Sequence, residues 1–318
     1  MNEAPRTTSL FDRPSLVHLE ALGRALDPLP GFGAFLDALP DIYAGTDFRR
    51  LARRWAECAL ERRPVGIGYG AHVVKVGVQA HLMDLMRRRA LGFLATHGAG
   101  AIHDVELAMA GKTSEDVAAG LEEGRFGMAG ETVEVWKAAL GRVHSDGIGL
   151  GEALGREIVD NDFPYRRHAL LAQAYELDMP VAVLVAVGTD TLHVHPGMDG
   201  AALGEGSMRD FRRLCQFVAT LERGLWINLG SAVILPEAFL KGVALAANSG
   251  IDLSGMMTAV LDMIRHYRPT QNVVVRPPGQ GLQIHGQHEL LVPLLHQAVR
   301  WYMQHPRPRE GEACASAS

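Results

Sequence analysis

Apolar residues recur at helical spacing through much of the chain, with polar residues between them. This period predicts a group of helices before residue 63, and an amphipathic helix over 79–89 that ends in three arginines, as suits the helix dipole. Later helices are expected wherever the same period returns. The expected helices cover 16–26, 32–39, 48–62, 79–89, 131–140, 169–177, 210–221, 237–247 and 289–303.

Short continuous apolar runs alternate with these helices and predict strands. The clearest run is 180–187, which contains four valines and therefore suits a strand buried on both faces of a parallel sheet. Further strands are expected over 91–95, 225–229 and 272–276, and an apolar, glycine-rich stretch covers 65–71. Alternation of strands and helices predicts right-handed crossovers, hence an α/β fold with a doubly wound, mostly parallel sheet and helices on both faces.

The pattern divides the chain into three parts. We expect a helical lead-in over 1–63, an α/β nucleotide-binding domain over 64–305, and a small, polar, disordered tail over 306–318. With 318 residues and 47% hydrophobic composition, the chain is long and apolar enough for a large core.

Charge and composition exclude several classes of partner. A net charge of −5 argues against nucleic acid as a partner. Apolar stretches of about 18 residues are absent, so a membrane span is not expected. The first residues lack an apolar signal core, so a cytoplasmic location is the default. The three cysteines are scattered, which indicates neither a disulfide framework nor a zinc knuckle.

A glycine-rich turn at 97–104 follows the strand expected over 91–95 and precedes a helical segment. Such a strand–turn–helix junction presents free backbone N–H groups at the carboxyl edge of a sheet, where phosphates bind. The turn also contains His103 and Asp104, which can move protons. It therefore predicts an anion site, a proton-transfer site, or both.

Three other glycine-rich loops, at 66–70, 188–205 and 228–231, also follow apolar runs. Loops after parallel strands meet at one edge of a sheet, so together the four predict a shared ligand crevice. The alternative for each loop is that its glycines only permit tight turns.

The loop over 188–205 is the richest in polar side chains. His193, His195 and Asp199 could bind a metal ion, or could be hydrogen-bonded residues that line a polar pocket. Asp199 and Glu205 could hold an ammonium group across a small pocket, or could be solvated. We expect His193, His195 and Asp199 to face the ligand, opposite His103 and Asp104.

Lys75 lies among apolar neighbours, where a desolvated amine could form a Schiff base. Such a lysine more often extends to solvent or pairs with an acid. We therefore predict that Lys75 is not a covalent catalyst.

Several motifs in order resemble those of the deoxyhypusine synthase family. The turn over 98–104 is similar to the family's TGA turn closed by His-Asp or Glu-Asp, and 199–205 (DGAALGE) is similar to DGSLGD. Residues 228–233 (NLGSAV) stand where the family has LGGGV, and 288–295 (HELLVPLL) resembles the family's DASLVxPLL. The resemblance runs from about residue 64 to 303.

The resemblance implies NAD bound at the strand ends and a homo-oligomer, dimer or tetramer, with sites at dimer interfaces. It also implies transfer of an aminobutyl group from a polyamine to an amine. By position, the resemblance places Gly68, Gly70, Thr96, Gly98, Asp104 and Gly230 at the nucleotide, and Asp199 and Glu205 at the amine. Further candidates are Gly100 and Ser231 for cofactor binding and Glu237 and His288 for substrate binding, and the candidate catalytic residues are His103, Asp104, His193 and His195.

The family's imine-forming lysine motif, EAVSWGK, is absent, and no lysine follows Lys241. We therefore expect an NAD-binding enzyme that acts on a small amine or polar metabolite, not deoxyhypusine formation. Two alternatives stay open. One is a metal-dependent hydrolase or lyase using His193, His195 and Asp199, and the other is a non-catalytic nucleotide-binding oligomer.

Overall fold

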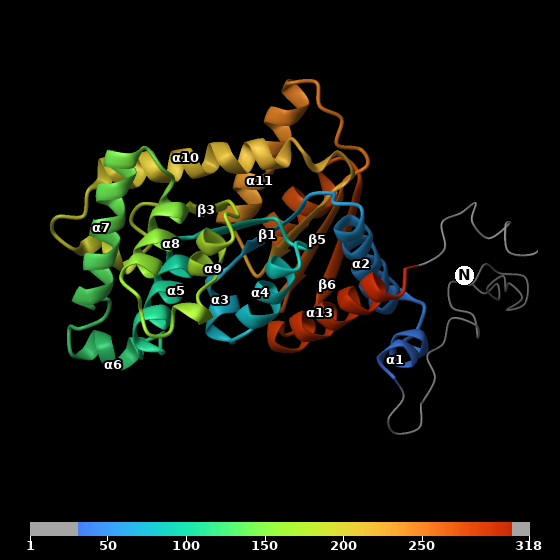
Figure 1. The fold of residues 1–318 in the computed structure, drawn as a ribbon, viewed down its shortest axis with the longest axis horizontal. Coiled ribbons are helices and arrows are strands. Elements are labelled where there is room, and N and C mark those ends of the chain that lie inside the picture. Colours follow the sequence, from blue (N-terminus) through green and yellow to red (C-terminus); the bar gives the residue numbers. More distant parts are fainter. Residues whose placement is uncertain (1–30, 307–318) are drawn as a thin grey trace, which may run out of the picture.

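Six parallel strands form one sheet at the centre of the computed structural model, which describes residues 31–306 (Figure 1). The strands are β1 (Val65–Tyr69), β2 (Phe93–His97), β3 (Val181–Leu184), β4 (Leu225–Leu229), β5 (Met257–Asp262) and β6 (Gln280–His285). Their order across the sheet is β3-β2-β1-β4-β5-β6, and each neighbouring pair is parallel. The predicted parallel, doubly wound sheet is confirmed, and the strand order reverses between β1 and β4.

Helices cover both faces of this sheet. One face carries α2, α4, α5, α8, α9 and α13; the other carries α11, the carboxyl half of α10 and a π-helical segment over 270–275. The helices are α1 (Phe32–Ala38), α2 (Tyr43–Leu60), α3 (Ala71–Lys75), α4 (Gln79–Arg87), α5 (Gly98–Ala110), α6 (Val117–Glu122), α7 (Gly130–Asp146), α8 (Leu150–Asp160), α9 (Leu170–Glu176), α10 (Gly200–Val218), α11 (Ile234–Asn248), α12 (Tyr267–Pro269) and α13 (His288–Gln304). In Figure 1, α10 crosses one side of the molecule from α7 to α11.

Strand residues supply apolar side chains to both faces, which explains their continuous apolar runs. Ile67 of β1 belongs to the core under α2 and α5, whereas Trp226 of β4 belongs to the core under α11. Trp226 stacks on Phe239 of α11, with ring centroids 4.9 Å apart. Each face of the sheet thus has its own packed apolar layer.

Three segments differ from the predicted strands. The run over 272–276 is not a strand, because it forms the end of the π-helical segment, where Val273 packs into the core under α11. β5 and β6 were not predicted. β6 is an edge strand in which only Leu282 and Ile284 are buried, so its sequence alternates and lacks a continuous apolar run.

Two loops are also shorter than predicted. The polar loop expected to extend to residue 206 ends at Asp199, because Asp199 caps α10 and the helix begins at Gly200. Most of the loop expected over 66–70 lies inside β1, so only Gly70 belongs to the turn.

The lead-in helices α1 and α2 pack into the apolar core on one face of the sheet. Leu51 and Trp55 of α2 are buried with residues of α13 and of the sheet, and the Trp55 indole donates to the carbonyl of Ala90 at 2.6 Å. The helix expected over 16–26 and the tail after residue 306 lie outside the described residues. Between residues 31 and 306, no helix combines the length and the apolar character needed to cross a membrane.

Candidate functional site

The centre of the carboxyl edge, where the strand order reverses, is closed by backbone contacts. A Cβ atom on Gly70, after β1, would lie 2.1 Å from the carbonyl oxygen of Gly230, after β4. Gly230 has a φ of +68°, and a Cβ there would lie 2.5 Å from the ring of His288. Both glycines are therefore required for close chain packing, and Gly70 leaves no gap toward Gly230 for a ligand.

Two histidines lie at this point. The rings of His72 and His288 have centroids 5.6 Å apart. The His288 Nε2–H donates to the carbonyl of Leu261 at 3.3 Å, so Nδ1 holds the lone pair, and it is buried with no partner among residues 31–306. Burial lowers the pKa of His288 below its usual value. The residue is fully buried, so the predicted substrate contact of His288 would need the edge to open.

The neighbouring turn, between β2 and α5, holds an anion that belongs to the chain itself. A Cβ on Gly98 would lie 1.9 Å from Oδ2 of Asp190, which comes from the loop after β3. The backbone N–H of Ala99 also donates to this carboxylate. Backbone N–H groups and the helix dipole favour negative charge at this position. In this structure the Asp190 carboxyl group, whose pKa burial raises, occupies the place where the sequence predicts an anion site, and that site stays a prediction.

The rest of the loop over 185–199 is braced by hydrogen bonds. Nδ1 of His193 accepts from the backbone N–H groups of Gly188 and Asp190 at 3.1 and 3.2 Å. Nε2–H of His195 donates to the carbonyl of Gly127 at 2.8 Å. The loop therefore lies on the α5 turn, as predicted from the adjacency of β2 and β3. Through these contacts, His193 and His195 hold the backbone of the loop in place.

The side chains predicted as metal ligands do not converge. Asp199 Oδ1 accepts from the backbone N–H groups of Ala201 and Ala202, so this carboxylate caps α10. Within residues 31–306, no group of three or more His, Cys, Asp or Glu side chains could hold a metal ion. The metal-dependent alternative built on His193, His195 and Asp199 therefore has no ligand set here.

His103 on α5 forms a hydrogen-bonded chain with two other residues. Its Nδ1 lies 2.6 Å from Oγ1 of Thr113, and the Thr113 hydroxyl donates to Glu106 at 2.5 Å. Because that hydroxyl proton goes to Glu106, Nδ1 of neutral His103 must be the donor to Thr113, which leaves Nε2 with the lone pair. An imidazole oriented by a carboxylate through a hydroxyl is suited to accept a proton.

Asp104 lies elsewhere than predicted. Its carboxylate is fully buried and accepts from the backbone N–H groups of Leu170 and Leu171 at 2.9 and 2.8 Å, at the start of α9. Burial raises its pKa to about 7, and the two hydrogen bonds oppose that rise. Successive residues of a helix point about 100° apart, so His103 and Asp104 project to different sides of α5. Asp104 therefore joins α5 to α9 and does not face His193.

The predicted substrate carboxylates Glu205 and Glu237 are paired with basic side chains. Glu205 pairs with Arg209 at 2.6 Å, and Glu237 pairs with Lys241 at 2.5 Å and Arg268 at 3.1 Å. Asp199 and Glu205 thus form no facing pair across a pocket. Exposed carboxylates in such pairs contribute little to stability and can exchange partners.

Most of the remaining predicted cofactor residues support the fold. A Cβ on Gly68 would lie 2.8 Å from Trp226, so Gly68 faces the core under α11. Thr96 donates to the carbonyl of Tyr69 at 3.0 Å and fills the space beside Gly100, and Ser231 is buried, with its hydroxyl accepting from Leu235. Buried glycine and hydroxyl residues of this kind allow strand ends to pack closely.

An apolar cavity of about 300 Å³ opens beyond the end of β3, between α10 and α11. Leu184, Val187, Phe211 and Ile234 are among its lining residues. It lies at the same sheet edge as the Asp190 contact, because Leu184 ends β3 and Val187 lies in the loop that carries Asp190.

Asp190, Thr113 and Glu106 were not predicted as site residues. For Asp190 a signal existed, since it follows a strand that was expected beside β2. For Thr113 no local pattern pointed to His103, because the contact depends on how the segment after α5 folds back.

Comparisons with known proteins bear on the fold. No family model matches this chain, and no curated protein matches it. Among solved structures, the chain is similar to a conserved candidate LOR/SDH protein from Methanococcus maripaludis S2, with 14% identity and a TM-score of 0.53 over 82% of this chain and 71% of that one. It is also similar to a candidate deoxyhypusine synthase from Entamoeba histolytica, with 10% identity and a TM-score of 0.50 over 88% and 97%.

A third similar structure is AgrE, solved as a ternary complex with ornithine and NAD+. Identity is 12% and the TM-score is 0.55, over 83% of this chain but only 34% of AgrE, so the chain spans about a third of that protein's length. These likenesses show a Rossmann-like α/β fold of the deoxyhypusine synthase kind.

Proposed function

We propose that this chain is an NAD-binding enzyme that acts on a small amine or polar metabolite by hydride, proton or group transfer. The observation that carries the proposal is the Asp190 carboxylate on the amino terminus of α5. This contact marks a point at the carboxyl edge that accepts negative charge without a basic side chain, as phosphate sites at helix amino termini do.

Of the two glycine turns, at Gly98 and at Gly70, the one at Gly98 fits the phosphates of a dinucleotide. At Gly98 the space next to the backbone contains a carboxylate, and a phosphate oxygen could take the same N–H groups. At Gly70 the space contains backbone, so we do not assign a phosphate there. The apolar cavity beside Leu184 and Ile234 offers a surface for an apolar ring of the same ligand. When bound, NAD would supply a hydride acceptor.

We assign the proton-transfer role to His103. Thr113 and Glu106 orient its ring, and Nε2 carries the lone pair that would accept a proton from an amine or hydroxyl. Burial lowers the pKa of His97, at the end of β2, and the nearby His103 lowers it further.

AgrE is described in complex with NAD+ and ornithine, an amine-bearing amino acid, which supports testing NAD and small amines on this scaffold. The second candidate is a nucleotide-binding oligomer without catalytic activity. It predicts the same binding but no turnover of any amine.

Isothermal titration calorimetry of NADH binding to the full-length protein tests the proposal. We expect measurable affinity in the wild type, and several-fold tighter binding in Asp190→Asn, because the variant removes the charge that competes for the α5 turn. Asp116→Asn is the matched control, because Asp116 caps α6 by the same kind of contact and belongs to no proposed site.

Gly98→Val should abolish binding, because its side chain would occupy the anion position. Absence of affinity for NAD+ or NADH at millimolar concentration in both the wild type and Asp190→Asn would end the proposal. Equal changes in Asp190→Asn and Asp116→Asn would assign the effect to helix stability instead.

A further inference from the structure

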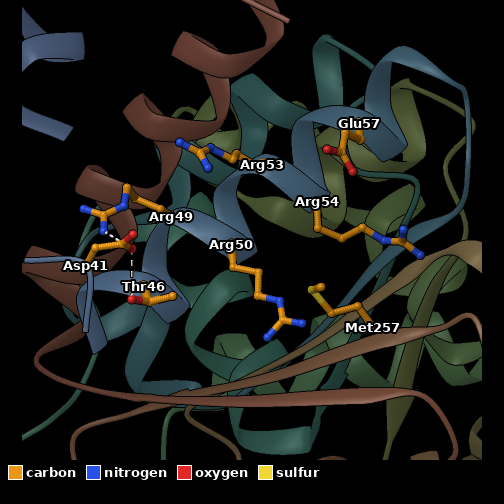
Figure 2. Close-up of a pocket in the computed structure, with 8 residues that line it drawn as sticks. All are labelled: Asp41, Thr46, Arg49, Arg50, Arg53, Arg54, Glu57 and Met257. Atoms are coloured by element: carbon orange, nitrogen blue, oxygen red, sulfur yellow. Dashed lines mark hydrogen bonds and ion pairs between the residues drawn. The ribbon is translucent and has the colours of Figure 1, made fainter. Parts of the chain in front are cut away.

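Four arginines of α2 line one surface hollow of about 550 Å³ (Figure 2). Arg49, Arg50, Arg53 and Arg54 lie on successive turns of the helix, and Asp41, Thr46, Glu57 and Met257 complete the lining. Met257 begins β5, so the hollow lies at the amino edge of the sheet, opposite the edge that carries the Asp190 contact.

Two of the four guanidinium groups have partners that explain them. Arg49 donates to the carbonyls of Leu36, Leu39 and Pro40 and pairs with Asp41 at 2.6 Å, so it closes the turn between α1 and α2. Arg53 lies over the Tyr302 ring of α13, with its Cζ 5.0 Å from the ring centroid, but its Nε is buried with no partner in the described part of the chain.

Among the four, only Arg49 is paired with a described carboxylate, so Arg50 and Arg54, like Arg53, are not neutralised by one. Nη2 of Arg54 donates to the carbonyls of Arg223 and Gly255 at 2.9 and 2.7 Å, while its Nε is buried with no partner in the described part of the chain. Arg50 is exposed and makes no hydrogen bond or ion pair with residues 31–306. Figure 2 shows the Arg50 and Arg54 guanidinium groups on either side of Met257.

This arrangement is electrostatically unfavourable without an anion. Arg50 and Arg54 are four residues apart on one helix, where like charges repel. Four arginines against two carboxylates give the lining a formal charge of +2, in a chain whose net charge is −5. Asp41 is already paired with Arg49, which leaves Glu57 as the one lining acid beside Arg54.

We propose that this hollow binds a phosphate-bearing ligand between Arg50 and Arg54. The planar guanidinium group presents paired donors that match phosphate oxygens, and two such groups separated by an apolar floor suit a dianion. The hollow has room for more than one phosphate group. Arg54 also holds the carbonyls that precede β4 and β5, so an anion here would contact the residue that joins α2 to the sheet.

Inorganic pyrophosphate is the probe, titrated into the full-length protein by calorimetry at low ionic strength. We expect one site in the wild type and roughly tenfold weaker binding in Arg50→Gln, the size expected for loss of a charge-assisted contact. Glu57→Gln should bind more tightly, because it removes a nearby negative charge. Arg212→Gln is the matched control, an exposed arginine of α10 outside the hollow.

Several results would overturn the proposal. One is absence of pyrophosphate binding by the wild type, and another is binding that is unchanged in both Arg50→Gln and Glu57→Gln. Binding lost in Gly98→Val but retained in Arg50→Gln would place the anion at the opposite edge. Malonate binding as tightly as pyrophosphate would show a carboxylate site rather than a phosphate site.

Discussion

Three aspartates each place a carboxylate on the start of a helix that is distant in the sequence. Asp104 bonds to α9, Asp190 to α5, and Asp210 to the backbone N–H groups of Gly151 and Val183, at α8 and β3. Burial raises the pKa of Asp104 and Asp210 to about 7. These contacts join elements that are not neighbours along the chain, so no local pattern revealed them.

The raised pKa of Asp104 has a definite sign for stability. A carboxyl group whose pKa is higher in the folded state contributes stability at low pH, which is lost as pH rises through about 7. We expect Asp104→Asn to lower the unfolding free energy by about 1–3 kcal/mol at pH 5, because one buried N–H loses its acceptor. The deficit should shrink by pH 8.

Urea unfolding of the wild type and of Asp104→Asn at pH 5 and pH 8 measures this stability deficit. The comparison between the two proteins removes the contributions of His97 and His288, whose lowered pKa values act in the opposite direction. A deficit that grows between pH 5 and pH 8 would contradict the assignment.

The hydrogen bonds of His103 predict its tautomer. We expect the neutral ring to carry its proton on Nδ1, because Thr113 donates its own hydroxyl proton to Glu106. Imidazole ¹⁵N shifts above the pKa of the ring would show this directly. Thr113→Val should restore the usual preference for a proton on Nε2, whereas Thr220→Val, which removes a hydroxyl at the end of α10, should not.

At the scale of elements, the two central turns decide how closely β1 and β4 approach. Most helices and three of the six strands, β2, β3 and β4, followed from apolar patterning, because each buries a continuous face, whereas β1 was expected only as an apolar, glycine-rich stretch. β6 did not, since an edge strand needs only two buried side chains. The run over 272–276 is rich in β-branched residues, which favour strands. It is nevertheless mostly π-helical, because Val273 packs into the core under α11, so tertiary packing outweighs the local preference here.

The contact between Gly70 and Gly230 predicts a strong effect of a single methyl group. In Gly70→Ala the added atom would meet a backbone carbonyl 2.1 Å away, which cannot rotate aside. We expect a loss of about 3 kcal/mol or more in unfolding free energy, as for other overpacked cores.

Thermal or urea unfolding tests this, with Gly141→Ala as control. Gly141 is helical, has open space around it, and should gain slightly from alanine. Equal stability of Gly70→Ala and wild type would mean that the two turns separate readily.

At the scale of the whole molecule, the sequence predicted which edge collects the loops but not what each side chain does there. The adjacency of β2 and β3 placed the loop over 185–199 on the α5 turn, as expected from sheet topology. The individual roles of Asp104, Asp199 and Gly68 depended on contacts with helices or strands elsewhere, which motif spacing does not encode.

The same edge bears large apolar side chains in contact with solvent. Val187, Val233, Ile264 and Tyr267 follow β3, β4 and β5, and all are between 47% and 74% exposed. Such side chains are typical of surfaces that meet another protein. We therefore keep the expected homo-oligomer as a proposal, with this edge at its interface.

Light scattering of the full-length protein should give a mass above the 34.5 kDa of one chain. Ile264→Glu or Tyr267→Glu should lower that mass toward one chain, because a charge would be buried at the interface. Val117→Glu, an exposed apolar position on α6, is the control and should leave the mass unchanged. A monomeric wild type at high concentration would refute this proposal.

The Asp190 contact also lowers the apparent affinity that an assay would measure for any anionic ligand of the α5 turn. A carboxylate on the same chain has an effective local concentration on the order of millimolar, so it competes continuously with a free ligand. The apparent dissociation constant equals the intrinsic dissociation constant divided by the fraction of molecules in which Asp190 has left the turn. Screens at micromolar ligand would therefore overlook weak but specific anions, and Asp190→Asn is the form of the protein in which to search for them.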